Sequence, residues 1–148
     1  MKIVLDTNVL ISGLLTPFGP SGEIVRMVFS GELTVYIDAR ILAEYKDVLH
    51  RPKFKFNKEH IGILLDFIKK YGQFTSSSPL KNRLPDPDDE PFLEIAIAGM
   101  VKSLVTGNRK HYPSLVFKGV NIFSPSEFLE FYRKQVKPHF SIKKYASL

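Results

Sequence analysis

The sequence predicts a three-layer α/β fold, in which a central parallel sheet of four to five strands is covered by helices on both faces. Short apolar segments typical of buried strands alternate along the chain with segments of helical periodicity, which is the pattern of a parallel sheet with crossover helices. The 148 residues, 44% of them hydrophobic, are enough for one domain with its own core. Right-handed crossovers then bring the carboxyl ends of the strands to one edge of the sheet.

Four apolar runs are predicted to be the strands of this sheet: Lys2–Leu5, Thr34–Ile37, Ser103–Thr106 and Val120–Phe123. A fifth, short edge strand could lie in the polar, serine-rich segment 74–83, which otherwise predicts a loop. The predicted order of elements is therefore β-α-β-α-α-(loop)-α-β-β-α.

Helices are predicted where apolar residues recur at helical spacing and a capping residue precedes them. Asp38 and Asn57 can cap two of these helices, and Ser124–Glu127 is a capping box with proline at the first helical position. The predicted helices cover residues 21–31, 38–50, 57–72, 86–99 and 124–133.

The apolar periodicity fades after Arg133, which divides the chain into a domain of residues 1–132 and a basic C-terminal tail of residues 133–148. Pro138 interrupts this tail, and lysines dominate its charge. A disordered end, an arm on RNA and a docking strip for a partner all remain open for it.

Composition limits the kinds of site that the chain can form. It has no cysteine, so a metal site must use oxygen or imidazole ligands. No signal peptide and no membrane-spanning run is visible, and the expectation is a soluble, cytoplasmic protein. The net charge of +6 favours a polyanionic partner such as nucleic acid, although a merely basic protein is the alternative.

Polar residues follow two of the predicted strands, where an open parallel sheet binds its ligands. Asp6, Thr7 and Asn8 come directly after the first strand, and Asn108 follows the third through Gly107. Asp6 could ligate a metal, or it could only cap the turn into the next helix. Asn108 could likewise belong to a site, or only to a Gly-Asn turn.

Two further acidic positions could join Asp6. Glu44 lies about 100° from the centre of its helix's apolar stripe, where a side chain can lean into a cleft or remain solvated. The run Asp86–Glu90 holds four acids in five residues. Helix capping needs one or two of them, and the surplus is easier to explain if a cation lies nearby.

Other catalytic motifs are absent. The chain has no glycine-rich phosphate loop, no G-x-G-x-x-G, no HExxH and no G-x-S-x-G elbow. The four histidines, His50, His60, His111 and His139, show no ligand spacing, and each is interpreted as a surface residue rather than a ligand or general base.

At these acidic positions the chain resembles PIN-domain proteins, specifically the VapC-like toxin components of bacterial and archaeal toxin–antitoxin systems. The likeness runs from residue 1 to about residue 130, and its strength lies in the order and spacing of its stretches. The matching stretches are Ile3–Ser12, Leu42–Tyr45 with Val48–Phe54, Asp86–Asp89 with Phe92–Glu94, and Val105–Asn108.

The resemblance implies a metal-dependent endoribonuclease that uses Mg²⁺ or Mn²⁺ and is restrained by a cognate antitoxin. It implies Asp6, Glu44 and Asp89 as metal ligands and catalytic residues, with Thr7 and Asp86 in support. Asn108 stands where the family often has a fourth acid, which puts a second metal in doubt. A PIN-fold protein with weak catalysis, acting in RNA binding or regulation, is the alternative. PIN relatives are often homodimers, and no membrane partner is expected.

Overall fold

The computed structural model describes residues 1–112 and 116–146. Six α-helices, six strands and three short 3₁₀ helices make up the described chain. In chain order they are β1 (Lys2–Leu5), α1 (Thr7–Leu15), α2 (Pro20–Phe29), β2 (Thr34–Ile37), α3 (Ala39–Leu49), η1 (Pro52–Phe54), α4 (Lys58–Tyr71), β3 (Gln73–Phe74), η2 (Pro87–Asp89), α5 (Glu90–Ala98), β4 (Ser103–Val105), η3 (Arg109–His111), β5 (Val116–Phe117), β6 (Val120–Phe123) and α6 (Pro125–Ala146).

The strands form one sheet in the order β3-β2-β1-β4-β6-β5. The first five of these are parallel, which confirms the predicted parallel α/β sheet, and β5 adds an antiparallel strand at one edge. From β1 the chain builds the sheet outward in both directions, so the order reverses between β1 and β4. In open α/β sheets this switch point is where ligands bind.

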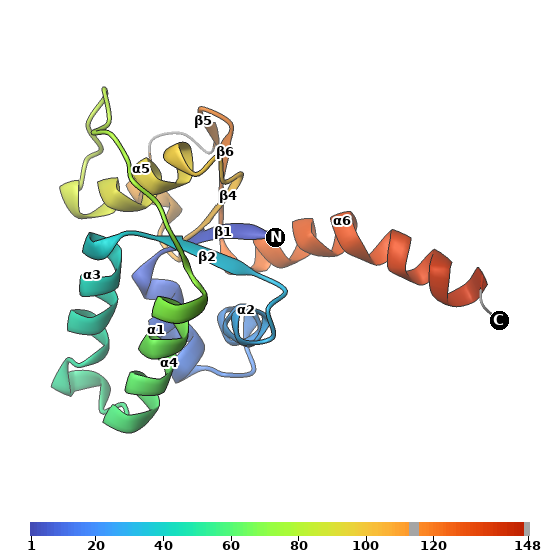
Figure 1. Ribbon diagram of the computed structural model, residues 1–148, viewed down its shortest axis with the longest axis horizontal. Coiled ribbons are helices and arrows are strands. Elements are labelled where there is room, and N and C mark those ends of the chain that lie inside the picture. The colour runs from blue at the N-terminus through green and yellow to red at the C-terminus, as the bar shows by residue number, and fades with distance from the viewer. Residues whose placement is uncertain (113–115, 147–148) are drawn as a thin grey trace.

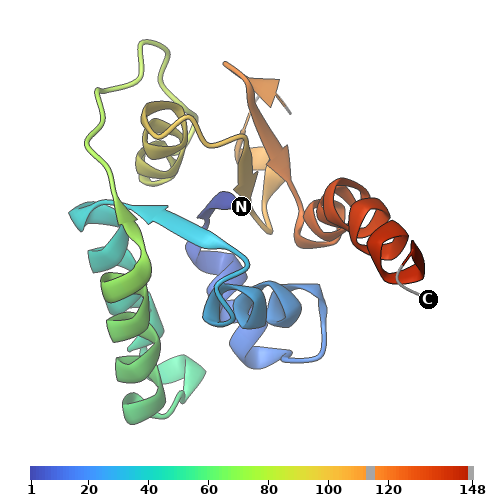
Figure 2. The same ribbon diagram turned by 45° about the vertical axis from the view of Figure 1, so that its right-hand side comes forward.

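Helices cover both sides of the sheet (Figures 1 and 2). Both views show α5 on one side of β1 and β2, with α1 and α2 on the other. Helix α6 packs against α2, β4 and β6, and α3 runs beside α4. The central strands are apolar on both faces, as a doubly covered sheet requires: Ile3, Val4, Leu5, Leu104 and Val105 are all fully buried.

The predicted helix starts are confirmed by their capping hydrogen bonds. Asp38 Oδ1 accepts from Ile41 N at 3.0 Å, and Asn57 Oδ1 accepts from His60 N at 3.1 Å. The capping box is reciprocal, because Ser124 N donates to Glu127 Oε1 at 2.8 Å and Glu127 N donates to Ser124 Oγ at 3.2 Å. Helix α5 begins after η2 and carries Pro91 in its first turn, as predicted.

The structure corrects the predicted elements at the beginning of the chain. Helix α1 was not predicted, because its sequence is apolar on most sides and shows no clear polar face. It packs closely on α2 through Gly13, where a Cβ atom would lie 2.7 Å from a methyl group of Val25. The turn expected after β1 is therefore the start of this helix, and Asp6 occupies its N-cap position.

Helix α6 also differs from the predicted ending near Arg133, because it continues through the basic tail to Ala146. Figure 1 shows the last turns of α6 extending away from the body of the molecule. None of the helices in the described part of the chain combines the length and apolar character needed to cross a membrane.

Candidate metal centre

Asp6 lies at the carboxyl end of β1, beside the end of β4. Leu5 is in register with Val105, and the Asp6 N–H continues this ladder by donating to Val105 O at 2.9 Å. Thr106, the residue after β4, therefore adjoins Asp6, and its hydroxyl donates to Asp6 Oδ2 at 2.8 Å. Asp6 makes no side-chain cap to α1, so its carboxylate belongs to the switch point rather than to the helix.

Glu44 reaches the same sheet edge from α3. The Thr7 hydroxyl donates a short hydrogen bond to Glu44 Oε2, which joins the residue after Asp6 to α3. The next residue of α3, Tyr45, is fully buried and donates its hydroxyl to Leu5 O at 2.5 Å. These two contacts fix the position of α3 relative to β1 and hold the half-buried Glu44 toward the switch point.

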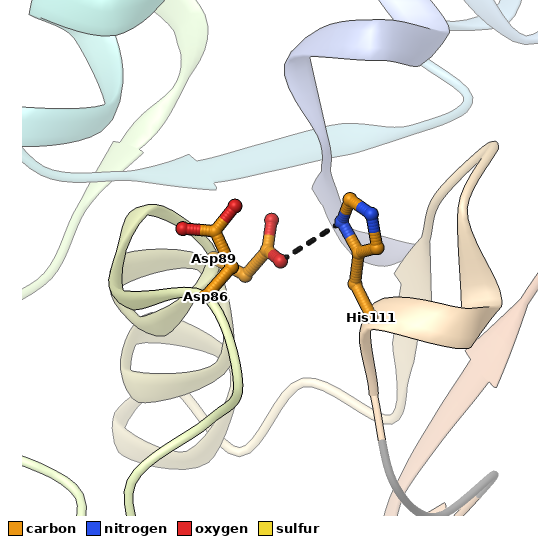
Figure 3. Close-up of side chains that lie close together, drawn as sticks. All are labelled: Asp86, Asp89 and His111. Carbon is orange, nitrogen blue, oxygen red and sulfur yellow. Dashed lines mark ion pairs between the residues drawn. The ribbon is translucent and has the colours of Figure 1, made fainter.

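The third contribution comes from η2 and η3, whose side chains approach each other across the same edge (Figure 3). Asp86, Asp89 and His111 each offer a ligand atom, and these atoms all lie within 4.8 Å of one another. Asp89 Oδ2 lies 3.0 Å from His111 Nδ1. Figure 3 shows the Asp89 carboxylate directed toward the His111 ring, with Asp86 beside it.

The acids from these elements act on one another through their charges, although Asp6 and Glu44 are not part of the group of ligand atoms that lie within 4.8 Å of one another. Burial raises the pKa of Asp6 to about 6, and the charge of Asp89 adds to the effect while the Thr106 hydroxyl opposes it. Burial also raises the pKa of Glu44, with Asp6 contributing in the same direction. The pKa of Asp89 is raised by its burial and by Asp86 and Glu44, although His111 opposes that rise.

Two buried polar atoms at this edge have no hydrogen-bond partner among the described residues. They are Asp89 Oδ2, whose contact with His111 lacks hydrogen-bond direction, and the Tyr112 hydroxyl. Buried polar atoms are rarely left unsatisfied unless a ligand, ion or water completes them. Carboxylate oxygens are also the ligands that Mg²⁺ and Mn²⁺ prefer. The residues present therefore fit a divalent cation.

Asn108 is at the same end of β4 but does not join the acids through its side chain. Its backbone N–H donates to Thr106 Oγ1 at 3.0 Å, and its side chain is exposed and forms no hydrogen bond with the described residues. Asn8 instead connects the two strand ends, because its Oδ1 accepts from Gly107 N at 2.9 Å. The backbone contacts of Gly107 and Asn108 are therefore those of a turn after β4, which is one of the two interpretations given for this pair.

The acidic run is divided by the structure. Asp86 caps η2 by accepting from Asp88 N at 2.9 Å, and it also joins the group around Asp89. Glu90 turns away and pairs with Arg83, at 2.9 Å between Oε2 and Nε. The surplus of acids that suggested a cation is thus smaller than the sequence indicated, because Glu90 already has a cationic partner.

Sequence reasoning missed three residues of this centre. His111 was interpreted as a surface residue, yet it contacts Asp89, and its position three residues after Asn108 already placed it past the end of a strand. Thr106 was counted only as a strand residue. Tyr112 carried no signal in the sequence, because a tyrosine after a turn is usually a packing residue.

Two comparisons relate the chain to known proteins. The family model described as "PIN domain" matches residues 2–110. The uncharacterized protein MJ1680 of Methanocaldococcus jannaschii is 26% identical over 148 residues, a match that covers 90% of this chain and 93% of that protein.

Proposed function

The chain belongs to the PIN-domain family, whose members are mostly metal-dependent nucleases, and from this premise we propose that it is a Mg²⁺- or Mn²⁺-dependent endoribonuclease. We propose further that it is the toxin of a toxin–antitoxin pair.

One observation carries the proposal. Asp6 at the end of β1, Glu44 on α3 and Asp89 at the end of η2 act on one another through their charges: Asp89 raises the pKa of Asp6, Asp6 that of Glu44, and Glu44 that of Asp89, in each case after burial as the larger cause. Among the described residues, no lysine or arginine forms an ion pair with any of the three. Carboxylates held together without a compensating cation are costly unless a metal ion binds between them.

We assign the holding of the ion to Asp6, Glu44 and Asp89, with Asp86 in support. Thr106 orients Asp6 through its hydroxyl, and Thr7 does the same for Glu44. A divalent ion at this position would lower the pKa of an attacking water and neutralise charge on the phosphoryl group. No side chain of this chain then has to act as the nucleophile.

The segment Arg51–Phe56 supports RNA as the polymer that is cut. It alternates basic and aromatic residues, and the rings of Phe54 and Phe56 stack with their centroids 5.5 Å apart. Arg51 lies close enough to Glu44 to lower its pKa, so the segment adjoins the acidic centre. Lysines that neutralise phosphates and aromatic rings that stack on bases are the usual elements of single-strand binding.

The resemblance to the toxin branch supports a cognate antitoxin as a partner, and a homodimer is a further proposal from the same source. An aromatic cluster gives a protein partner a surface on which to bind: Phe29, Phe67 and Tyr71 contact one another at the border of a 440 Å³ groove between α2 and α4. Exposed apolar surface of this kind commonly marks interaction sites.

The test is a cleavage assay on purified protein that has been freed of metal with EDTA. Labelled single-stranded RNA, structured RNA and single-stranded DNA of matched sequence are incubated without metal, with Mg²⁺ and with Mn²⁺. Cleavage of RNA with either ion, and none with EDTA, is expected. Full activity in EDTA would overturn the metal mechanism, and equal cleavage of DNA would overturn the assignment to RNA. Salt-sensitive RNA binding without cleavage would favour the RNA-binding alternative.

A further inference from the structure

We propose that Asp86, Asp89 and His111 form a mixed nitrogen–oxygen cation subsite, which makes the centre prefer a divalent transition-metal ion such as Mn²⁺ or Co²⁺ over Mg²⁺. The inference deepens the proposed function, since it shares Asp89 with the all-carboxylate group of Asp6 and Glu44. It can also be tested by metal binding alone, because these residues can hold a metal ion whether or not the protein cuts RNA.

The three residues bring their ligand atoms close to one another. Their ligand atoms all lie within 4.8 Å of one another, and Asp89 Oδ2 is 3.0 Å from His111 Nδ1 without forming a directed hydrogen bond. Neighbouring ligands of an octahedral ion with bonds of about 2.1 Å lie about 3 Å apart. Figure 3 shows the imidazole and the Asp89 carboxylate facing each other with the Asp86 carboxylate alongside.

A second observation, independent of these three side chains, points to a ligand in the same place. The Tyr112 side chain follows His111 directly, is 4% exposed, and has no hydrogen-bond partner for its hydroxyl among the described residues. Burial, and after it the charges of Asp6 and Asp89, raises the pKa of this hydroxyl. A buried hydroxyl without a partner is expected to meet a bound group such as a metal-held water.

The residue types decide which ion is preferred. Mg²⁺ favours oxygen ligands and retains most of its waters, whereas imidazole is a ligand of transition-metal ions, whose affinity for a nitrogen-containing site rises from Mn²⁺ to Co²⁺. An all-carboxylate group such as Asp6 with Glu44 provides no such discrimination. His111 is the residue that would introduce it.

Asp89 belongs both to the carboxylate group with Asp6 and Glu44 and to the proposed subsite with Asp86 and His111, so it is the residue that the two groups share. Its carboxylate has two oxygens: its charge raises the pKa of Asp6, the charge of Glu44 raises the pKa of Asp89 in turn, and its ligand atom lies within 4.8 Å of those of Asp86 and His111. A second cation, which the exposed Asn108 side chain does not support, would therefore bind through Asp86, Asp89 and His111.

The experiment measures metal binding rather than activity. The full chain is stripped with EDTA, and calorimetric titrations with Mn²⁺, Co²⁺ and Mg²⁺ are compared for the wild type, His111→Ala and His111→Gln. The ratio of Mn²⁺ to Mg²⁺ affinity is expected to fall about tenfold or more in both variants, with Mg²⁺ affinity within about twofold of the wild type. The visible absorption of bound Co²⁺ should change in the same variants, because a nitrogen ligand is lost.

His60→Ala is the matched control, since His60 is exposed on α4 and lies outside the acidic centre, and it should leave all three affinities unchanged. The inference is overturned if either His111 variant folds and keeps the wild-type Mn²⁺ to Mg²⁺ ratio and Co²⁺ spectrum. A failure of the proposed ribonuclease function would look different. A protein that binds Mn²⁺ through His111 but does not cut RNA would support the metal subsite and contradict the ribonuclease activity.

Discussion

Asp89 and Glu90 are neighbours in sequence and are almost equally buried, at 7% and 6% exposed, yet their surroundings shift their pKa values in opposite directions. The pKa of Asp89 is raised, first by burial and then by other acids, with only His111 opposing. The pKa of Glu90 is lowered by its hydrogen bonds from Arg83 and from the Leu84 N–H. Two acids that are equally buried can therefore differ in whether a cationic side chain satisfies their charge, and it is the partner that sets the direction of the pKa shift.

Other buried acids also differ in whether an arginine is their partner. Glu94 on α5 is buried and accepts from Arg40 Nη1 at 2.7 Å, so its charge is satisfied by the protein itself. Asp6 and Glu44 receive hydroxyl hydrogen bonds but no ion pair from any described lysine or arginine. The paired acids, Glu90 and Glu94, each have an arginine partner and stabilise α5 and the loop before it. The unpaired acids, Asp6, Glu44 and Asp89, have no lysine or arginine partner among the described residues, and Asp89 contacts His111.

Asp6→Asn is expected to have the largest effect, because it removes a charge from the unpaired group. Lowering the number of charged ligands should reduce RNA cleavage by at least about 100-fold. The metal-free fold should become more stable at pH 7 by about 3 kcal/mol, the cost of ionising a carboxyl whose pKa rises from 3.8 to about 6. Urea unfolding in EDTA measures the second effect, and a variant less stable than the wild type would show that the ionised Asp6 carboxylate does not destabilise the metal-free fold.

The pH dependence of the metal-free protein should follow the unpaired acids. Because the folded-state pKa of Asp6 is raised to about 6, its stabilising contribution is complete below about pH 3.8 and is lost as the pH rises to 6. The free energy of unfolding in EDTA should therefore decrease by about 3 kcal/mol between about pH 4 and pH 7 from Asp6 alone, with Glu44 and Asp89 acting in the same direction.

Glu90 gives the opposite dependence, since the stability from its lowered pKa is present above 4.5 and is lost as the pH falls through its folded-state value. Unfolding curves from pH 3 to pH 8 should thus pass through a maximum on the acidic side of neutrality. Asp6→Asn should flatten the decrease above that maximum and leave the acidic limb in place. A wild-type protein whose stability rises from pH 5 to pH 7 without metal would contradict the raised pKa values of these acids.

Arg40→Ala tests the paired group, because it leaves the buried Glu94 carboxylate with only the Leu80 N–H as a partner. The expected loss is about 2 kcal/mol, between the values for exposed and fully buried pairs, since the arginine is half-exposed. Mn²⁺ affinity should not change. Arg133→Ala, which removes a more exposed ion pair with Glu23, is the control and should cost less than about 1 kcal/mol. A loss of metal affinity in Arg40→Ala would show that the paired acids also contribute to metal binding, contrary to the distinction between paired and unpaired acids.

The sequence predicted the part of the site that depends on strand ends. Asp6 follows an apolar run in a parallel sheet, and such a residue can face only the edge where the other strands also end. The strands β1, β2, β4 and β6 were predicted nearly to the residue, because an apolar run bounded by polar or turn residues has few other interpretations, whereas the two-residue edge strand β5 was not predicted. Asp38 and Asn57 were predicted as caps for a similar reason, since capping depends only on neighbouring residues.

Contacts between distant segments could not be predicted in this way. The sequence alone gives no means of separating Asp89 from Glu90, because their roles depend on Arg83 and His111, which lie on different loops. The Thr106 and Tyr112 hydroxyls became relevant only once β4 was placed beside β1. Helix α1 was missed because tertiary packing around Gly13, rather than amphipathic patterning, determines it.

The lysines of η1 and its following loop belong to neither acidic group, and they are expected to affect RNA binding without affecting stability. Replacing Lys53 and Lys55 by Gln should weaken binding of single-stranded RNA roughly tenfold, about 1.4 kcal/mol, and lower the slope of log affinity against log salt by about 1.4. The matched control replaces Lys69 and Lys70, two exposed lysines near the end of α4, and should preserve that slope. Equal losses in both variants would indicate that only net charge matters.

The smallest effect is expected from removing residues 137–148, which lie far from both acidic groups in the sequence. The contacts that anchor α6 come from its first turns, where Phe128 and Leu129 are buried and Tyr132 donates to Glu32 at 3.0 Å. Because residues 134–136 are already exposed and the helix extends away from the body, truncation after Val136 should change the free energy of unfolding by less than about 0.5 kcal/mol. Metal affinity should stay the same, and a lower RNA affinity would identify the tail as an arm on RNA. Loss of cooperative unfolding would instead mean that the end of α6 packs into the core, and the boundary of the domain at residue 132 would be wrong.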